Sequence, residues 1–368
     1  MFEIKSAYDP QKIHNSINNL PLLLCDDSDT ALANKLLSKD VGDGLAEETL
    51  LVEVLNRLFL KQIDATNDSR QKEFLTQLQR EAIRLAIGDL NFLSTELNAS
   101  QRFRWSKLEF SSYRIEKLAL FPLIVIKTVS AIPLLRLRHQ LRKGFTTREK
   151  LTVDSGMFPF LLARILDVFI RRKLFADAPL RKVTGFLRVV GVAIELSTDR
   201  AEWWKKNDSQ ADFYPSAYLH IDQTLENPKA ILYLTSVSKH SGPFEMFPTM
   251  LSSLKLTPLQ LLIGRAVAGV FPRCVCKCGV CCRQTSSRCQ RCQQDFISSL
   301  PQALQFNSHF GWDIPDETPH TWTELGKCVR VTGGAGTAVL FDGARTVHRG
   351  GLVQLGTRAA LQIVLSYS

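Results

Sequence analysis

Residues 336–351 read GTAVLFDGARTVHRGG and place one short apolar run between turn residues. Thr337–Phe341 is rich in apolar and β-branched residues, which favour strands. The dipeptides Asp342-Gly343 and Gly350-Gly351 follow it, Gly333-Gly334 precedes it, and pairs of this kind are typical of turns. The stretch therefore predicts a short strand in a turn-rich, sheet-forming part of the chain.

Further segments of the C-terminal half have the same strand-like composition. They are Phe186–Leu196, Ala230–Val237, Cys328–Thr332 and Ala359–Leu365. Short strands with turn signals and no interleaved helices are typical of barrels and sandwiches. We therefore expect residues 183–368 to form an all-β barrel or sandwich.

The first 100 residues show helical periodicity instead. Gly42 and Gly44 break the chain before one amphipathic segment, and Asn67-Asp68-Ser69 breaks it before a second. We expect the two segments to pack as a helical hairpin, which makes the fold class α+β. The apolar residues that recur at helical spacing are Leu51, Val52, Leu55, Leu58 and Phe59, and then Phe74, Leu75, Leu78, Ala82, Ile83, Leu85 and Ala86.

Residues 101–182 hold the excess positive charge. Between Arg102 and Lys182 there are 18 Lys and Arg against 6 Asp and Glu, while the net charge of the whole chain is +10. We interpret this segment as basic, amphipathic and helical. Such a field favours an anionic partner (a phosphate-bearing ligand, an acidic lipid surface or nucleic acid), and a solvated face without a partner is the alternative. Phe158–Phe175 could lie on a membrane surface, although such helices more often bury their apolar face in their own core.

The composition excludes several protein classes. With 45% hydrophobic and 22% charged residues among 368, the chain is not disordered, collagen-like or coiled-coil. We expect no secretory signal, and Leu118–Leu135 is too interrupted by prolines and a lysine to span a membrane. Seven of nine cysteines lie between Cys274 and Cys292, unlike a disulfide framework, so we expect a reducing, cytoplasmic location.

The sequence Tyr218-Leu-His220-Ile-Asp222 is the sharpest candidate for chemistry. In an extended strand, residues two apart point to the same side, so His220 and Asp222 can converge on one ion. His348 is a second isolated histidine, and two histidines with one carboxylate form the ligand set of non-heme Fe(II) oxygenases. Arg358, ten residues after His348, opens the last strand and could bind a carboxylate through two hydrogen bonds.

The order of these features resembles the phytanoyl-CoA dioxygenase-like branch of the Fe(II)- and 2-oxoglutarate-dependent oxygenases. The order is His-x-Asp, a strand, Gly-Pro, a strand, a histidine and a later arginine, with matching segments at Tyr233–Pro248 and Gly336–Gly343. The resemblance covers about residues 183–250 and 320–368. The chain departs from the family at Pro248-Thr249-Met250, where members usually have Pro-Gly-Ser-His.

The resemblance implies a double-stranded β-helix, a jelly-roll or cupin-like barrel with iron at its open end. It implies that His220, Asp222 and His348 hold Fe(II). It further implies that Arg358 binds the far carboxylate of 2-oxoglutarate, with Tyr233 as the aromatic residue beside it. The reaction so implied releases succinate and CO2. Asp222 favours hydroxylation, because halogenating relatives have a small residue in its place.

A cysteine cluster lies between the two halves of this set, in a segment of about residues 251–310. Its hairpin pairs can place four thiolates around a zinc ion, so we expect a structural zinc knuckle inserted in the barrel. An iron–sulfur cluster and free thiols are the alternatives. The expected ligands are Cys278, Cys281, Cys289 and Cys292, with Cys276 or Cys282 as substitutes.

Three functions are compatible with these observations. The first is an oxygenase that hydroxylates a small molecule, a lipid or a carrier-bound metabolite. The second is an oxygenase that acts on nucleic acid or protein, recruited through the basic segment and the zinc knuckle. The third is a binding protein on an inactive oxygenase scaffold, which the complete ligand set and Arg358 disfavour. Peripheral membrane contact is not predicted. The metal site does not reveal the substrate, because the pocket selects it.

Overall fold

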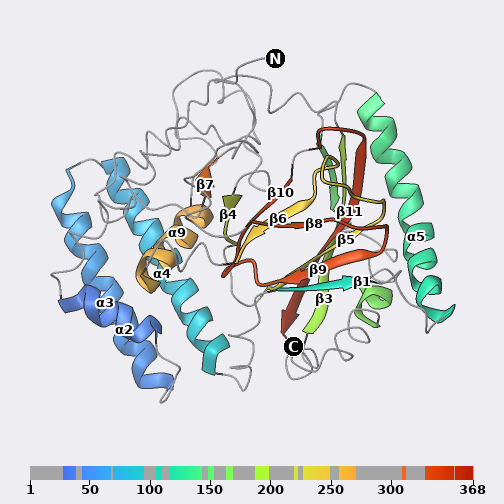
Figure 1. Cartoon of the computed structure of the whole chain (residues 1–368). Coiled ribbons are helices and arrows are strands. Elements are labelled where there is room, and N and C mark those ends of the chain that lie inside the picture. Colours follow the sequence, from blue (N-terminus) through green and yellow to red (C-terminus); the bar gives the residue numbers. More distant parts are fainter. Residues whose placement is uncertain are drawn as a thin grey trace. The chain divides into compact units, whose positions relative to one another are not determined.

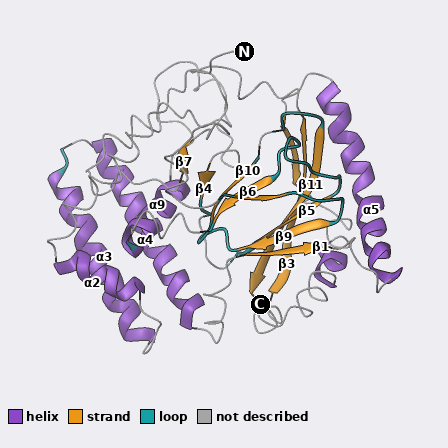
Figure 2. Ribbon diagram, viewed as in Figure 1, coloured by secondary structure: helices purple, strands orange, loops and turns teal. Residues whose placement is uncertain are grey.

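A computed structural model of the chain divides into two compact units (Figures 1 and 2). The first unit comprises Met1–Glu96, Asp208–Thr224 and Thr249–Lys327, and the second comprises Leu97–Asn207, Leu225–Pro248 and Cys328–Ser368. The structure describes residues 28–38, 44–67, 69–94, 105–109, 117–142, 148–152, 163–168, 187–198, 219–222, 227–248, 257–270, 309–311, 328–351 and 353–367.

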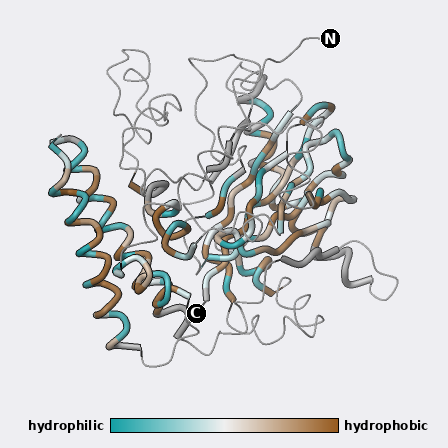
Figure 3. The backbone as a smooth tube through the Cα atoms, turned by 60° about the vertical axis from the view of Figure 1, so that its left-hand side comes forward, coloured by the Kyte–Doolittle hydropathy of each residue, from teal (hydrophilic) through white to brown (hydrophobic). Residues whose placement is uncertain are grey.

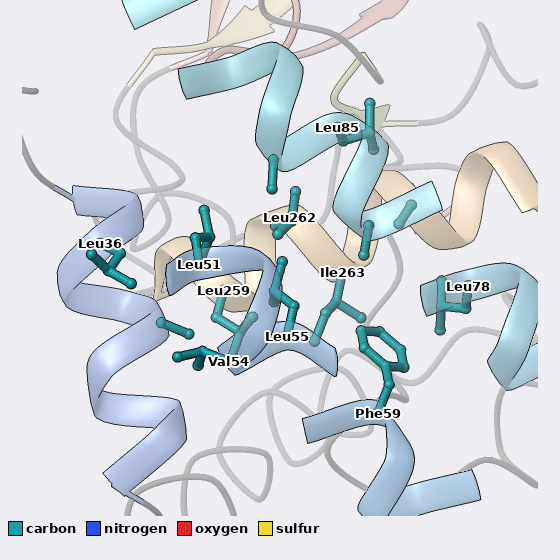
Figure 4. Close-up of a cluster of buried hydrophobic side chains, with 14 of the residues drawn as sticks. Leu36, Leu51, Val54, Leu55, Phe59, Leu78, Leu85, Leu259, Leu262 and Ile263 are labelled. Atoms are coloured by element: carbon teal, nitrogen blue, oxygen red, sulfur yellow. The ribbon is translucent and has the colours of Figure 1, made fainter. Parts of the chain in front are cut away.

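Helices of the first unit share one hydrophobic core. These are α2 (Ser28–Ser38), α3 (Gly44–Ala65), α4 (Ser69–Ser94) and α9 (Pro258–Val270). Helices α3 and α4 pack against each other as the sequence predicts, and they begin at the predicted breaks. Figure 4 shows the buried cluster, to which these helices contribute Leu36, Leu51, Leu55, Phe59, Leu78, Leu85, Leu259, Leu262 and Ile263.

Helix α9 lies inside the segment that the sequence assigns to a Cys-rich insertion. Its N-terminus is a capping box, in which Gln260 N donates to Thr257 Oγ1 (3.2 Å) and Thr257 N donates to Gln260 Oε1 (2.9 Å). Pro258 occupies the first helical position, where its missing N–H costs nothing. Leu259 N also donates to Asn34 Oδ1 on α2 (3.0 Å). The insertion thus begins as part of the helical core.

The second unit contains a six-stranded antiparallel sheet, here sheet A. Its order is β1-β9-β5-β11-β3-β2, and β11 pairs with both β5 and β3. The strands are β1 (Trp105–Glu109), β2 (Arg148–Thr152), β3 (Leu187–Thr198), β5 (Lys229–Tyr233), β9 (Thr337–Phe341) and β11 (Thr357–Tyr367).

Strands of a second antiparallel sheet, here sheet B, complete this unit. Strand β6 (Phe244–Phe247) lies between β10 (Val347–Gly350) and β8 (Val329–Val331). From β5 onward the chain passes from sheet A to β6 and β8 in sheet B, then to β9 in A, β10 in B and β11 in A. This alternation between two sheets is the winding of a jelly roll.

Apolar side chains fill both faces of sheet A. Tyr233, Val339 and Ala360 on the inner face pack against Phe244 and Met246 of sheet B. The outer face packs against α5 (Lys117–Arg142), and Figure 1 shows this helix beside the sheet. Figure 3 shows apolar residues recurring along the helices and the strands. Outer-face positions buried with α5 include Ile194, Leu196, Leu232, Leu340, Leu361 and Ile363.

The observed fold is therefore α+β, with strands where the sequence predicts them from residue 187 onward. The expected helical character of residues 101–182 is wrong in two places, because β1 and β2 form the edges of sheet A. Of Phe158–Phe175, residues 163–168 are described and helical, and Leu166 is buried in the core on the outer face. None of the described helices combines the length and hydropathy that a membrane span requires.

Candidate metal centre

His220 and Asp222 lie side by side in the first unit. His220 ends the two-residue strand β4 (Leu219–His220), which pairs with β7 (His309–Gly311), and Asp222 follows two residues later. His220 Nε2 is 3.9 Å from Asp222 Oδ1, and the two side chains are only 10% and 12% exposed. The two side chains therefore lie close together, as expected for residues two apart in an extended backbone.

His348 lies on β10 of the second unit, opposite Met246 of β6. Its imidazole is buried against the rings of Phe341 and Phe244, at centroid distances of 4.7 Å and 5.6 Å. Nδ1 is 2.8 Å from the carbonyl oxygen of Thr346. Because a carbonyl oxygen only accepts, Nδ1 must carry a proton, and in the neutral imidazole the lone pair is then on Nε2. Histidines that bind metals commonly donate their other N–H in this way.

His220 and Asp222 of the first unit offer one imidazole and one carboxylate side by side, and His348 of the second unit offers a second buried imidazole. Two neutral imidazoles and a carboxylate suit Fe(II) and leave coordination positions for co-substrate and oxygen. The donor chemistry therefore fits the metal that the resemblance implies. The predicted zinc ligands between Cys276 and Cys292 lie outside the described residues.

The inner face of sheet A carries an unexpected polar group. Arg358 of β11 is paired with Ser197 of β3, and Ala360 is paired with Glu195 of β3 and with Tyr233 of β5. Directly opposed residues of antiparallel strands share a face, and alternate residues of one strand do too. Since Ala360 and Tyr233 belong to the inner core, Arg358, Glu195 and Ser197 face the same interior.

The guanidinium of Arg358 is buried and extensively hydrogen-bonded. Nη1 donates to the carbonyl oxygens of Gly242 and Gly351, the latter at 3.4 Å. Nη2 donates to Glu195 Oε1 (3.3 Å) and to Ser197 Oγ (3.2 Å). The side chains of Arg358 and Glu195 are only 5% and 9% exposed, so their ion pair is an interior one.

Two glycines make this environment of Arg358 possible. A Cβ at Gly351 would collide with the carbonyl oxygen of Pro243, which Gly351 N meets at 3.0 Å. Gly242 has φ 70°, a conformation that only glycine adopts without strain. The Gly-Pro and Gly-Gly motifs therefore let two strand ends approach closely enough for both carbonyls to reach one guanidinium.

The hydroxyl of Tyr233 is engaged by the backbone of sheet B. It donates to the carbonyl oxygen of Val331 and accepts from Phe244 N, both at 2.8 Å. The ring is 1% exposed. Burial, foremost, raises the pKa of this phenol, the charges of Glu195 and Glu245 add to the effect, and the charge of Arg358 opposes it.

Sequence reasoning missed Glu195 and Ser197. The available signal was polarity, because Glu195 interrupts the otherwise apolar run VVGVAIEL. A carboxylate inside a buried strand requires a cationic partner, and Arg358 is a cation of the same strand-forming region. His240 lies in an exposed turn, where its Nδ1 is 3.0 Å from Gln354 Oε1.

No protein-family model and no curated protein matches the chain. Similar solved structures include the epimerase SnoN in complex with Fe3+, alpha ketoglutarate and nogalamycin RO (TM-score 0.34, 12% identity), over 74% of this chain and 82% of SnoN. EctD from S. alaskensis in its apo form gives a TM-score of 0.34 and 12% identity, over 74% of this chain and 76% of EctD. A Pseudomonas putida prolyl-4-hydroxylase gives a TM-score of 0.30 and 12% identity, over 74% of this chain and 97% of the hydroxylase. Similarities this low carry no weight for function, which we infer from the chain's own residues.

Proposed function

We propose that this chain is an Fe(II)- and 2-oxoglutarate-dependent oxygenase of the phytanoyl-CoA dioxygenase-like kind. His220, Asp222 and His348 hold the iron in this proposal. The donor set carries it, because His220 and Asp222 converge within 3.9 Å and, together with the buried imidazole of His348, supply the ligand types that suit Fe(II). The proton on His348 Nδ1 adds support, since it leaves the metal-binding lone pair on Nε2.

Iron bound there would supply, with 2-oxoglutarate and O2, the oxidation that releases succinate and CO2. The chain's own residues bind and orient the reactants. Arg358 is the buried cation suited to the far carboxylate, because it lies on the inner face of sheet A with its charge fixed by hydrogen bonds. Apolar side chains of the same interior, such as Val339 and Met246, are buried and would help to keep water from the reactants.

The proposed reaction is hydroxylation of a small molecule, a lipid or a carrier-bound metabolite. Asp222 supports hydroxylation, because it keeps a carboxylate where halogenating relatives of the resembled family have none. Tyr233 remains proposed as a residue beside the co-substrate, although its hydroxyl proton is already donated to Val331. A structural zinc in the cysteine segment and a cytoplasmic location are proposed from the sequence alone.

The experiment is an anaerobic calorimetric titration of Fe(II) followed by 2-oxoglutarate, with succinate release then measured in air across a library of candidate substrates. We expect 2-oxoglutarate to bind tightly only to iron-loaded protein. Absence of iron-dependent 2-oxoglutarate binding would reject the proposal, whatever the library shows.

A further inference from the structure

The five N–H donors of Arg358 are unequally used. Both donors of Nη1 reach backbone carbonyls, and both donors of Nη2 reach Glu195 and Ser197. Nε is buried and has no hydrogen-bond partner among the described residues. A single N–H is therefore left for any further ligand.

A bidentate carboxylate needs two adjacent N–H groups of the guanidinium. The two edges that offer such a pair are Nε with Nη2 and Nη1 with Nη2, and Nη2 is common to both. Glu195 Oε1 lies 3.3 Å from Nη2. A carboxylate that binds Arg358 through two hydrogen bonds must therefore displace Glu195 or Ser197 from Nη2.

Of Glu195 and Ser197, Glu195 opposes a second carboxylate at Arg358 more strongly, because it is charged. A second carboxylate at Arg358 would place two anions beside one cation in an interior that excludes water, and like charges there repel strongly. Ser197 accepts from the same nitrogen without a charge, and its hydroxyl donates to Glu195 Oε1 at 3.4 Å. Neutral Ser197 can turn aside at little electrostatic cost, whereas the anion cannot.

We propose that Glu195 is an internal competitor for Arg358 that weakens binding of the co-substrate's far carboxylate and so sets the 2-oxoglutarate concentration the enzyme requires. The inference rests on the proposed function and extends it to a specificity-determining residue. Glu195 acts through Arg358 and needs no contact with iron or substrate.

The test compares Glu195→Gln, Ser197→Ala and the unaltered chain by anaerobic calorimetry on Fe(II)-loaded protein. The probes are 2-oxoglutarate and pyruvate, because pyruvate has the same keto acid but lacks the far carboxylate. Glu195→Gln keeps the size and an acceptor oxygen while removing the charge. We expect it to tighten 2-oxoglutarate about tenfold, as the loss of one charged hydrogen bond would, with pyruvate unchanged. Ser197→Ala should alter 2-oxoglutarate affinity much less.

The outcomes separate the two proposals. Unchanged or weaker 2-oxoglutarate binding in Glu195→Gln overturns the competitor role, and so does an equal change for pyruvate. Absence of binding by both acids in the unaltered chain overturns the proposed function, and the competitor role with it. Should Glu195→Gln not fold, Glu195→Asp retains the charge but withdraws the carboxylate from Nη2. It should then tighten 2-oxoglutarate by a smaller factor, and no change would overturn the role.

Discussion

The hydroxyl of Tyr233 on β5 donates a hydrogen bond to the carbonyl oxygen of Val331 on β8, 2.8 Å away. The hydroxyl oxygen of Tyr233 also accepts a hydrogen bond from Phe244 N on β6. One phenol thus joins sheet A to two strands of sheet B through the interior of the second unit. Its position suggests a role in holding the sheets together.

Tyr233→Phe should therefore lower the free energy of unfolding by about 1–3 kcal/mol, because a buried N–H and a buried carbonyl lose their partner. Denaturant unfolding followed by circular dichroism measures the change. If stability is unaffected while 2-oxoglutarate affinity falls, Tyr233 is a co-substrate residue, as the sequence resemblance implies.

The raised pKa of Tyr233 predicts a loss of stability at high pH. In the unfolded chain the phenol ionises near its ordinary value of 10.0, whereas burial holds the folded pKa above it. The folded state then binds the proton more tightly, so its contribution is complete below pH 10 and falls as pH rises through the folded value. Unfolding curves from pH 9 to 11 should show a steeper decline for the unaltered chain than for Tyr233→Phe. Parallel declines would contradict the shift.

Removal of an iron ligand should abolish 2-oxoglutarate turnover. His348→Ala, His220→Ala and Asp222→Ala each remove one of three proposed protein ligands, and we expect Fe(II) affinity to fall by about tenfold or more. Anaerobic calorimetry measures it, with His240→Ala as the matched control, because this exposed histidine contacts Gln354 instead. Full succinate formation by the ligand variants would rule out the assigned site.

Arg358→Ala should weaken 2-oxoglutarate far more than iron. It removes a charge-assisted pair worth about 1.5–3 kcal/mol, while leaving the three iron ligands in place. Arg330→Ala is the control, since that arginine pairs with Glu245 at 2.8 Å and its side chain is 44% exposed. Retained Fe(II) binding shows that Arg358→Ala is folded. Unchanged 2-oxoglutarate affinity in such protein would mean that another cation binds the carboxylate.

The cysteine segment predicts a second, different metal. Protein purified without chelators should hold about one zinc that survives mild chelation, because a four-thiolate site is closed. Replacing Cys289 and Cys292 together with Ser should release that zinc but leave Fe(II) binding intact. Elemental analysis that finds no zinc in the unaltered chain would remove the knuckle.

The parts of the fold that sequence predicts are those where local signals agree. Thr337–Phe341 is found as the strand β9 with the predicted bounds, because apolar β-formers lie between glycine-containing turns. The α3–α4 hairpin follows for a similar reason, since chain breaks and helical periodicity coincide. In both cases the packing of the element in its core favours the same structure as its local sequence preference.

The features that the sequence did not predict are those whose local sequence signals are weak or whose contacts join distant parts of the chain. Strand β1 (WSKLE) and strand β2 (REKLT) are short and charged, and edge strands tolerate charge because one side is not paired. Helix α9 was not expected, although Thr257 and Gln260 have the spacing of the capping box that the structure shows at its start. Glu195 and Arg358 are 163 positions apart in the sequence. Their pairing follows from the register of β3 and β11 and cannot be predicted from local sequence.

The edge positions of β1 and β2 have a practical consequence for anyone who expresses part of this protein. A fragment that starts at residue 183, the boundary suggested by the composition, would lack both outermost strands of sheet A and helix α5. It would expose the unpaired backbone of β9 and β3 together with the apolar face that contains Leu340 and Ile194. Unprotected edges of that kind template aggregation. A fragment that keeps both edges of sheet A covered therefore has to begin before Trp105, even though none of the proposed iron or co-substrate ligands lies upstream of residue 183.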